Sequence, residues 1–530
     1  MRCSAPSGWN LVALAASALG CAAPSGPPVG RWIGDAAAAG GPERIEVVVD
    51  SSGTAQVSLR SWRLREAPMA QAGEAGGDSV AFASPGDSLR LAGSIEGGRW
   101  TGELSRGAER VAITLLRLAA LDAPAREGLV GTYRADDGRL LGVGPFSEFG
   151  PDLMVVDYDT GEIAPLYPLS PDAMMRGPAL LSPVLAPDSV VAERDEAGQV
   201  RGLTISRERH PAMWVTRIAT RDTSAQFANG EVMLAGTLTL PEGAGPHPAL
   251  VLVHGSNAQT RDAMGPWVRF FAGRGFAVLS YDKRGTGGST GDWKQADFEA
   301  LAGDAAAAVD FLAARPEIRR DQIGLWGISQ AGWLLPMVAA AQPDRVAFLI
   351  VHAGTGTTVR EQGVLNLAYE LRASGLPERS VAVGIEYQNL SDALTRTGKG
   401  WEALQQFHTA HRDAEPWLPE PDPPEAWFRS YYRLLIDFDP APYWRQVRCP
   451  VLLFFGGLDV NVPPKESWPP IERGLREAGN TNVTQVVLPR GNHVLLEART
   501  GAGSEYPGLT RFTAGYFDRM TEWLGATVRR

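Results

Sequence analysis

Residues 325–332, which read Leu-Trp-Gly-Ile-Ser-Gln-Ala-Gly, restrict the fold of this chain more than any other stretch. The stretch 321–326 (Asp-Gln-Ile-Gly-Leu-Trp) indicates a short buried strand, and the Ala-rich apolar run at 333–341 is typical of a helix packed on a sheet. A strand that runs directly into a helix leaves one residue in a tight turn, and its neighbours must be small because the two backbones nearly touch. The pattern Gly-x-Ser-x-Ala therefore predicts that Ser329 lies in such a turn, with its hydroxyl in front of the helix N-terminus.

A serine at this position acts as a nucleophile only if a base lies within hydrogen-bond reach and an acid orients the base. In the chain order serine, acid, histidine that this turn accompanies, the histidine comes last. Of the seven histidines, only His493 follows the last acid at a strand end, Asp459. Each of the two follows an apolar run and lies in a loop that contains glycine. Because the carboxyl ends of parallel strands share one edge of a sheet, we expect Ser329, Asp459 and His493 to meet as nucleophile, acid and base.

An oxyanion site is the fourth part that such chemistry needs. The unbroken apolar run 248–253 is typical of a central parallel strand, and it ends in His-Gly-Ser-Asn at 254–257. We expect the backbone N–H groups of Ser256 and Gln330 to bind a developing oxyanion. His254 precedes Ser329 in the chain, so we interpret it as a structural residue.

From about residue 225 to the C-terminus, the chain resembles the α/β-hydrolases. It is similar to the branch that holds serine aminopeptidase-like, dienelactone hydrolase-like and prolyl-oligopeptidase-like enzymes. The matching segments follow one another in the expected order: His254-Gly255, 281–291 (Tyr-Asp-Lys-Arg-Gly-Thr-Gly-Gly-Ser-Thr-Gly), 327–332, 457–463 (Gly-Leu-Asp-Val-Asn-Val-Pro) and 491–493 (Gly-Asn-His). The resemblance implies an α/β fold with a mostly parallel, doubly wound sheet and a helical cap. It also implies hydrolytic chemistry, but it does not identify the substrate.

At 530 residues, the chain is too long for a single core, so we expect several domains. Residues 22–125 contain short, partly alternating apolar runs at even spacing, which is typical of a small antiparallel β-sandwich or barrel. Residues 126–217 predict a second β-rich module or a continuation of the first. Such modules either dock or shield a substrate or act as a spacer, and we favour the spacer. The α/β-hydrolase domain is predicted at 225–530.

The strand rhythm of this domain stops between 357 and 445, which predicts a helical cap inserted there. Its aromatic residues either line a substrate pocket or form the core of the cap, and their helical spacing favours the core. These residues are Trp401, Trp417, Trp427, Tyr431, Tyr432 and Trp444. His408 and His411 share a helix face, but no carboxylate pattern accompanies them, so we predict no metal site.

The loop after the strand at 276–280 is rich in glycine, yet it lacks the order of residues that cradles a phosphate. We therefore expect no nucleotide to bind there. Asp282 and Arg284 of this loop are expected to brace the loops around the site through charge-assisted hydrogen bonds.

Residues 1–21 predict an export signal, with Arg2 followed by the short apolar run 11–19. The segment resembles a bacterial lipoprotein signal in which Cys21 becomes the lipid-bearing first residue, although Ala18-Leu19 reverses the usual order. Simple cleavage is the alternative. We expect an exported protein that is either periplasmic or held on a membrane through Cys21. Cys449 is then left without a disulfide partner, and we interpret it as a buried small residue.

These observations predict a serine hydrolase that cleaves carboxylic esters through an acyl-enzyme and acts on a small-molecule ester or peptide. A net charge of −10 argues against a nucleic-acid partner, and the mechanism requires no metal or organic cofactor. One alternative is an exported serine peptidase or thioesterase with the same three residues. Another is a ligand-binding surface lipoprotein whose hydrolase domain is degenerate, and the complete set of site residues weighs against it.

Overall fold

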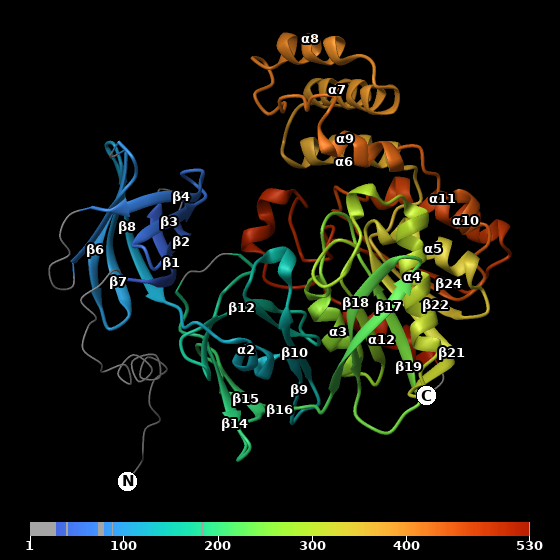
Figure 1. Ribbon diagram of the computed structural model, residues 1–530, viewed down its shortest axis with the longest axis horizontal. Coiled ribbons are helices and arrows are strands. Elements are labelled where there is room, and N and C mark those ends of the chain that lie inside the picture. Colours follow the sequence, from blue (N-terminus) through green and yellow to red (C-terminus); the bar gives the residue numbers. More distant parts are fainter. Residues whose placement is uncertain (1–27, 39–40, 73–78, 87, 182–184, 529–530) are drawn as a thin grey trace. The chain divides into compact units, whose positions relative to one another are not determined.

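A computed structural model describes residues 28–38, 41–72, 79–86, 88–181 and 185–528 (Figure 1). The predicted signal at 1–21, including Cys21, lies outside the described residues. The chain forms two compact units. The first contains the described part of Met1–Gly144 with Phe149–Val156 and Ile163–Ile218, and the second contains Pro145–Glu148, Asp157–Glu162 and the chain from Ala219 onward. In the ranges that the structure covers, no helix is both long and apolar enough to cross a membrane.

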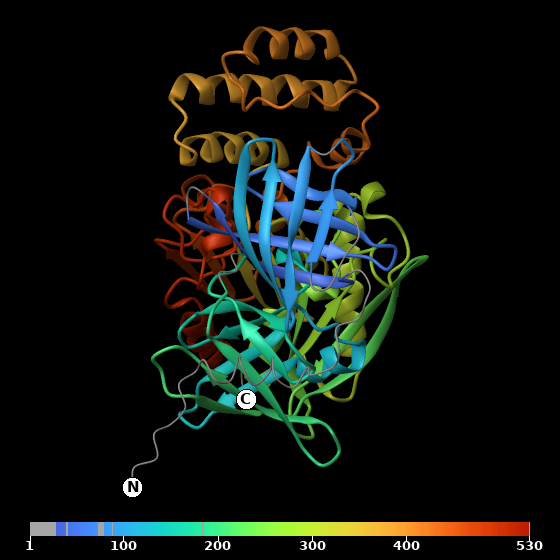
Figure 2. The same ribbon diagram turned by 90° about the vertical axis from the view of Figure 1, so that its left-hand side faces the viewer.

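The first unit begins with a closed antiparallel barrel, drawn in blue in Figure 2. Its strands follow one another in chain order, and β1 closes the barrel by pairing with both β2 and β8. Side chains fill the interior, where the rings of Trp32 and Trp100 meet edge to face at 5.5 Å. The strands are β1 (Gly30–Ala38), β2 (Gly41–Val49), β3 (Thr54–Leu59), β4 (Leu64–Gln71), β5 (Ser79–Ala83), β6 (Leu89–Glu96), β7 (Arg99–Arg106) and β8 (Glu109–Arg117).

A short helix, α2 (Ala123–Leu129), leads into a second closed antiparallel barrel with its own buried core. Here β9 pairs with both β10 and β16. The predicted antiparallel β modules in front of an α/β domain are thus confirmed, and both are barrels. The strands are β9 (Gly131–Ala135), β10 (Leu140–Pro145), β11 (Leu153–Asp157), β12 (Ile163–Pro168), β13 (Ala173–Arg176), β14 (Ser189–Arg194), β15 (Val200–Ser206) and β16 (Met213–Arg217).

The second unit is built on an eight-stranded sheet in the order β17-β18-β20-β19-β21-β22-β23-β24. The pairs β17–β18 and β18–β20 are antiparallel, and every later pair is parallel, so the sheet is mostly parallel as predicted. The strands are β17 (Arg221–Asn229), β18 (Val232–Leu240), β19 (His247–Val253), β20 (Ala277–Tyr281), β21 (Ile318–Ile328), β22 (Val346–His352), β23 (Val451–Gly456) and β24 (Val483–Leu488).

Helices cover this sheet and complete its core. The Ala-rich helix α4 packs on β17, β19 and β21, and α5 packs on β21 and β22. Asp297 caps α4 by accepting a hydrogen bond from the Ala300 N–H at 2.9 Å. The helices outside the insertion are α3 (Gly265–Ala272), α4 (Phe298–Ala313), α5 (Ala331–Ala341), α11 (Pro464–Glu477) and α12 (Tyr516–Thr527).

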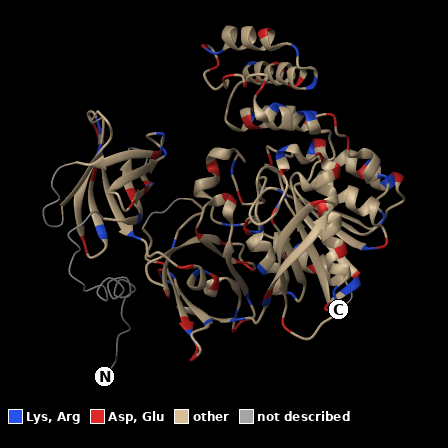
Figure 3. Cartoon of the chain, viewed as in Figure 1, with Lys and Arg blue, Asp and Glu red and all other residues tan. Residues whose placement is uncertain are grey.

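The insertion between β22 and β23 contains five helices, drawn in orange in Figure 1. It opens with a capping box, in which Thr358 and Glu361 satisfy each other's backbone N–H groups. Helix α7 contacts α6, α8 and α9. The helices are α6 (Val359–Ala373), α7 (Glu378–Thr397), α8 (Trp401–His411), α9 (Trp427–Leu435) and α10 (Ala441–Trp444). Acidic and basic residues are interspersed along the elements of both units (Figure 3).

Candidate active site

The residues predicted to do chemistry lie at the carboxyl ends of three parallel strands. Ser329 follows β21 directly, Asp459 follows β23 after two residues, and His493 lies in the loop after β24. Strands β21, β22, β23 and β24 are successive neighbours in the sheet. All three side chains therefore belong to loops at one edge, which is where ligands bind in open α/β sheets.

Ser329 adopts a left-handed backbone conformation, with φ of +56°. A residue other than glycine, asparagine or aspartate rarely takes this conformation, and it marks strain that the surrounding structure must hold. The packing around the turn is tight enough to do so. A Cβ atom added at Gly327 would lie 2.5 Å from the Ala331 Cβ, and one added at Gly332 would lie 2.4 Å from the Gly354 Cα. Alanine is accepted at 331 because its methyl group occupies the space that Gly327 leaves.

Asp459 and His493 are hydrogen-bonded to each other. The His493 Nδ1 lies 3.0 Å from Asp459 Oδ2 and 3.2 Å from Oδ1. The carboxylate is fully buried, and its Oδ1 also accepts the backbone N–H groups of Asn461 and Val462, each at 2.8 Å. The acid is therefore held in place by several hydrogen bonds. Because Asp459 binds Nδ1 of His493, the other ring nitrogen, Nε2, is left for a different partner.

Glycines join the loops that carry this pair. A Cβ atom added at Gly456 would lie 2.3 Å from the Gly491 carbonyl oxygen, so the two loops approach as closely as backbones can. The Leu458 N–H donates to that same oxygen at 2.9 Å. Asn492, which is buried, accepts the N–H groups of Val494 and Leu496 with its Oδ1 and shapes the turn. In the predicted Gly-Asn-His segment, the glycine thus allows the close approach of the two loops and the asparagine stabilises the turn.

The His493 imidazole lies between opposing electrostatic influences. Burial lowers its pKa, whereas the charge and hydrogen bond of Asp459 and the charge of Glu148 raise it, and the net effect is a raised pKa. Only 11% of the His493 side chain is exposed. Asp459 opposes the desolvation effectively because its buried carboxylate lies within hydrogen-bond distance of the ring.

Ser329 and His493 are connected through His352, the last residue of β22. The Ser329 N–H donates to the His352 carbonyl at 3.0 Å, and the charge of His493 acts on the buried His352 ring. Among the described residues, the Ser329 hydroxyl donates to no acceptor, so the structure does not join Ser329 Oγ to His493 by a hydrogen bond. Hydrogen bonds of this kind are often long without substrate.

The predicted oxyanion loop lies against the serine. Val253 at the end of β19 is paired with Gly327, and a Cβ atom added at Gly255 would lie 3.7 Å from the Ser329 Cβ. In the described part of the chain, the N–H groups of Ser256 and Gln330 donate to no protein acceptor. Both are therefore available to a ligand beside Ser329.

His254 is buried, and its Nε2 lies 2.5 Å from the Tyr281 carbonyl oxygen. Burial and the nearby Lys283 charge lower the pKa of His254 to about 3, so the ring is neutral. Its contacts are those of a structural residue. Cys449 is half-buried, and burial raises the pKa of its thiol to about 12, which makes it a poor nucleophile at neutral pH.

The loop after β20 braces the site, and it does so with ion pairs on both sides. Asp282 accepts two side-chain hydrogen bonds and one backbone hydrogen bond from Arg261 at 2.7–3.0 Å. Arg284 binds Asp304 of α4 with two hydrogen bonds of 2.6 and 2.7 Å. Lys283, which lies between them, donates to the oxyanion loop itself and was not singled out from the sequence. Its neighbours in the chain gave no signal that it would be buried.

The aromatic residues of the insertion divide between two roles. Trp401 and Trp417 pack in the cap, and Trp444 is buried in the core of the sheet. Tyr431 of α9 lies beside the site, because the Gln330 side-chain amide donates to its hydroxyl at 3.4 Å. His408 lies 3.5 Å from Glu420, and His411 is stacked on Phe407. Among the described residues, no three His, Cys, Asp or Glu side chains gather as a metal site would require.

Acidic side chains approach the site from two further segments of the same unit. Partial burial raises the pKa of the half-buried Tyr506, and the charges of Asp459, Glu148 and Glu370 raise it further. Glu370 also accepts the Gly503 N–H at 3.3 Å. Glu148 could not be found from the sequence, since it is distant from every motif.

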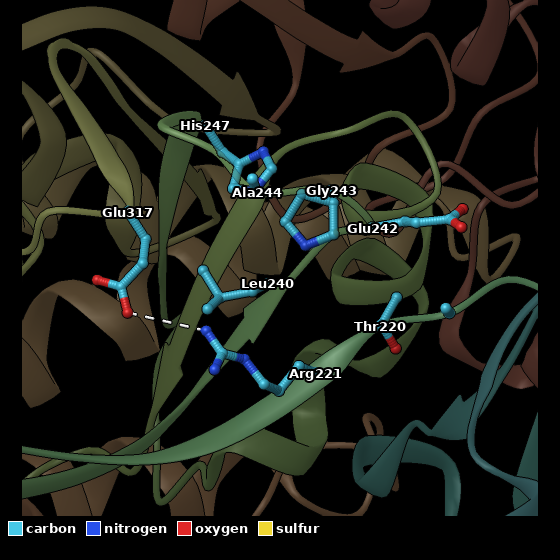
Figure 4. A pocket seen from close by; sticks show the side chains of 10 residues that line it. Thr220, Arg221, Leu240, Glu242, Gly243, Ala244, His247 and Glu317 are labelled. Carbon is cyan, nitrogen blue, oxygen red and sulfur yellow. Dashed lines mark ion pairs between the residues drawn. The ribbon is translucent and has the colours of Figure 1, made fainter.

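A cavity of about 250 Å³ lies at the other edge of the sheet (Figure 4). It is lined in part by His247, which begins β19, and by Glu317, which precedes β21. Arg221 lies 3.8 Å from Glu317 across it. These are the amino ends of strands whose carboxyl ends carry the candidate site, so the cavity is a separate feature.

Comparison with known proteins assigns the chain to a family. Residues 229–494 match the sequence profile of the X-Pro dipeptidyl-peptidase (S15 family). The chain is 29% identical over 248 residues to the thiohydrolase aneE of Aspergillus aculeatus. This alignment covers 44% of this chain and 75% of that protein. It is 28% identical over 283 residues to the esterase EstD of Thermotoga maritima, covering 52% of this chain and 60% of that protein, which is less than two thirds.

Two solved structures of hydrolases can be aligned with this chain. An esterase of Pyrococcus furiosus has 17% sequence identity and a TM-score of 0.39, and the alignment covers 59% of this chain and 92% of that one. The 2,6-dihydroxy-pseudo-oxynicotine hydrolase has 19% identity and a TM-score of 0.36, covering 59% of this chain and 68% of that one. At these scores, the structural likeness adds nothing to the family match.

Proposed function

The chain belongs to the X-Pro dipeptidyl-peptidase (S15) family and is a hydrolase of the α/β fold, and from this premise we propose that it is a serine hydrolase that cleaves carboxylic esters. The observation that carries the proposal is the Asp459–His493 hydrogen bond at the sheet edge where Ser329 occupies a strained turn. A paired base and acid beside a serine in that conformation suit nucleophilic catalysis.

In the proposed mechanism, Ser329 Oγ attacks the carbonyl carbon of the ester while His493 Nε2 accepts the hydroxyl proton. Asp459 holds Nδ1 and stabilises the imidazolium that forms. The N–H groups of Ser256 and Gln330 donate to the negatively charged oxygen of the tetrahedral intermediate. The intermediate collapses, the alcohol leaves with the proton from His493, and an acyl group remains on Ser329. Water, deprotonated by His493, then releases the acid.

An ester substrate is supported by two relatives, one an esterase and the other a thiohydrolase. Both activities transfer an acyl group from a heteroatom that leaves readily. This reaction requires a nucleophile, a base and oxyanion donors, and Ser329, His493 and the N–H groups of Ser256 and Gln330 are the candidates for these parts.

The test is a substrate profile of the purified protein. We expect turnover of p-nitrophenyl esters that vanishes in Ser329→Ala, with an unchanged melting temperature. Loss by at least about three orders of magnitude is expected, since removal of one member disables the whole triad. Undiminished turnover in Ser329→Ala would refute the proposal.

A second candidate is peptide cleavage with the same three residues. The family's description favours it, and so do the carboxylates of Glu148 and Glu370, whose charges converge on Tyr506 near Asp459. Carboxylates near the site could bind the positively charged amino terminus of a peptide. Amino-acid and dipeptide p-nitroanilides in the same profile distinguish the two candidates. Faster anilide turnover that falls in Glu370→Gln would favour the peptidase.

A further inference from the structure

Lys283 is the one buried lysine of a chain that uses arginine almost everywhere else. The sequence has four lysines among 50 basic residues, and Lys294, Lys399 and Lys465 are exposed, whereas 2% of Lys283 is exposed. A buried ammonium group is costly unless its donors are all satisfied. Its position, between Asp282 and Arg284 in the loop that braces the site, therefore requires an explanation.

The contacts of Lys283 match the three donors of an ammonium group. Nζ donates to the Gly255 carbonyl at 2.6 Å, to the Asn257 carbonyl at 3.0 Å and to the Gln330 Oε1 at 3.0 Å. A neutral amine has two N–H donors and would leave one of these acceptors unsatisfied. A planar guanidinium could not place three donors around one point. The geometry fits a protonated lysine.

Two of these acceptors flank the residue whose N–H is proposed to bind the oxyanion. The Gly255 carbonyl and the Ser256 N–H belong to one peptide unit, and in a trans peptide they point in opposite directions. A lysine that fixes the carbonyl therefore fixes the direction of the N–H. The positive charge of the ammonium group, which donates to the carbonyl oxygen, also polarises the peptide and makes that N–H a stronger donor.

The third acceptor links Lys283 to the other proposed donor. Gln330 contributes its backbone N–H to the oxyanion, and its side chain is held between Lys283 Nζ and the Tyr431 hydroxyl. A single cation thus contacts Gln330 and both residues that flank Ser256. Asn257 has a φ of +65°, and its carbonyl contact with Lys283 stabilises this strained turn.

We propose that Lys283 is a positioning residue of the oxyanion hole, whose ammonium group orients and polarises the Gly255–Ser256 peptide and holds Gln330 in register with it. The inference rests on the proposed function and deepens it. Lys283 does not act as a base toward Ser329, because its three donors are engaged elsewhere. Burial lowers its pKa to about 7, with Asp304 raising it, so a charged state at neutral pH depends on the acceptors already described.

The decisive variant is Lys283→Met, which keeps the length and apolar stem of the side chain and removes the donors. We expect kcat for a p-nitrophenyl ester to fall about 10- to 100-fold with KM within about twofold, because the oxyanion forms only in the transition state. Affinity for a trifluoromethyl ketone, whose tetrahedral adduct places an oxyanion in the hole, should fall by the same factor. A residue that only held the fold would not change these two quantities in parallel.

The matched control is Lys294→Met, which removes an exposed lysine of the same unit and should change neither quantity. A folded Lys283→Met protein with kcat and inhibitor affinity within twofold of wild type would overturn the inference, and so would a rise in KM alone. If Ser329→Ala retains turnover, the inference fails together with the proposed function. If Ser329→Ala is inactive and Lys283→Met is normal, the inference fails by itself.

Should Lys283→Met not fold, Gln330→Leu removes one acceptor and leaves the lysine in place. We expect kcat and inhibitor affinity to fall together by about three- to tenfold, since one of the three bonds is lost. No change in either quantity in the folded Gln330→Leu protein would overturn the proposal.

Discussion

Three histidines of the hydrolase unit lie in different electrostatic environments, although each is largely buried. His493 has a carboxylate at hydrogen-bond distance and a raised pKa. His254 and His352 lack such a partner, and burial lowers the pKa of each, to about 3 for His254. Near neutral pH, His493 is therefore the one of the three that can exchange a proton, as a base in catalysis must.

The pH dependence of kcat/KM should report the His493 pKa. The imidazolium cannot accept the Ser329 proton, so activity should rise with pH through a pKa above the ordinary value of about 6.5. In Asp459→Asn, the carboxylate that stabilises the imidazolium is lost, so the pKa falls and the acidic limb moves to lower pH. The rate should also fall by about four orders of magnitude, because the ring loses its orientation.

Glu148→Gln provides the matched control for that profile. The charge of Glu148 also raises the His493 pKa, yet Asp459 continues to orient the ring. We expect a smaller shift of the limb in the same direction, with kcat at its plateau within about threefold of wild type. A limb that stays in place in both variants would show that His493 is not the group that titrates.

The turn between β21 and α5 shows why small residues recur in this element. Gly332 contacts Gly354 backbone to backbone, and Gly327 is covered by Ala331 and Leu335. A larger residue at either glycine would separate the helix from the sheet and relax the strain at Ser329. Alanine at 331 needs no such adjustment, because its methyl group lies over Gly327, which has no side chain.

Gly332→Ala should destabilise the hydrolase unit even though alanine favours a helix. The added methyl group would lie 2.4 Å from the Gly354 Cα, and overpacking of this kind costs about 1–3 kcal/mol. Gly525→Ala in α12 is the control, because a Cβ atom there has no neighbour within 4 Å. It should stabilise the protein by up to about 1 kcal/mol. Thermal unfolding of the two variants measures the difference, and equal melting temperatures would contradict the prediction.

Some strands of the N-terminal barrels have weak sequence signals. Strand β4 contains Pro68, and Met69 is its one buried residue, so it has no apolar alternation. Strand β13 has four residues. Such segments become strands because neighbours on both sides supply hydrogen-bond partners and a closed barrel leaves no edge. Their structure is decided by pairing and not by their own residues.

At the scale of the whole molecule, the balance of basic residues is unusual. Arginine forms most of the ion pairs, and lysine occurs four times. Amine-reactive reagents should therefore modify few positions. This makes the burial of Lys283 directly measurable.

We expect limited acetylation of the native protein to modify Lys294, Lys399 and Lys465 and to spare Lys283, because an enclosed amine is shielded from the reagent. After unfolding in denaturant, all four should react. Peptide mass mapping of the two samples measures the protection. Modification of Lys283 in the native protein at the rate of the other three would contradict its burial.

The sequence by itself determined the class of the protein, since its signals there are local. Unbroken apolar runs indicate buried parallel strands, and the small residues around Ser329 indicate a strand that turns directly into a helix. The order of Ser329, Asp459 and His493 along the chain identified the pair that the structure shows hydrogen-bonded. The α/β fold and hydrolase class are confirmed by the family match, while the roles of the three residues stay predictions.

Only the tertiary structure decided which segments far apart in the chain come together. The closure of two separate barrels, the approach of Glu148 and Glu370, and the burial of Lys283 against Gly255 and Gln330 depend on contacts between segments far apart in the chain. Lys283 and Gln330 are buried, although each is charged or polar and would be read as exposed from its local pattern. Burial is a property of the whole packing, so a local pattern could not predict it.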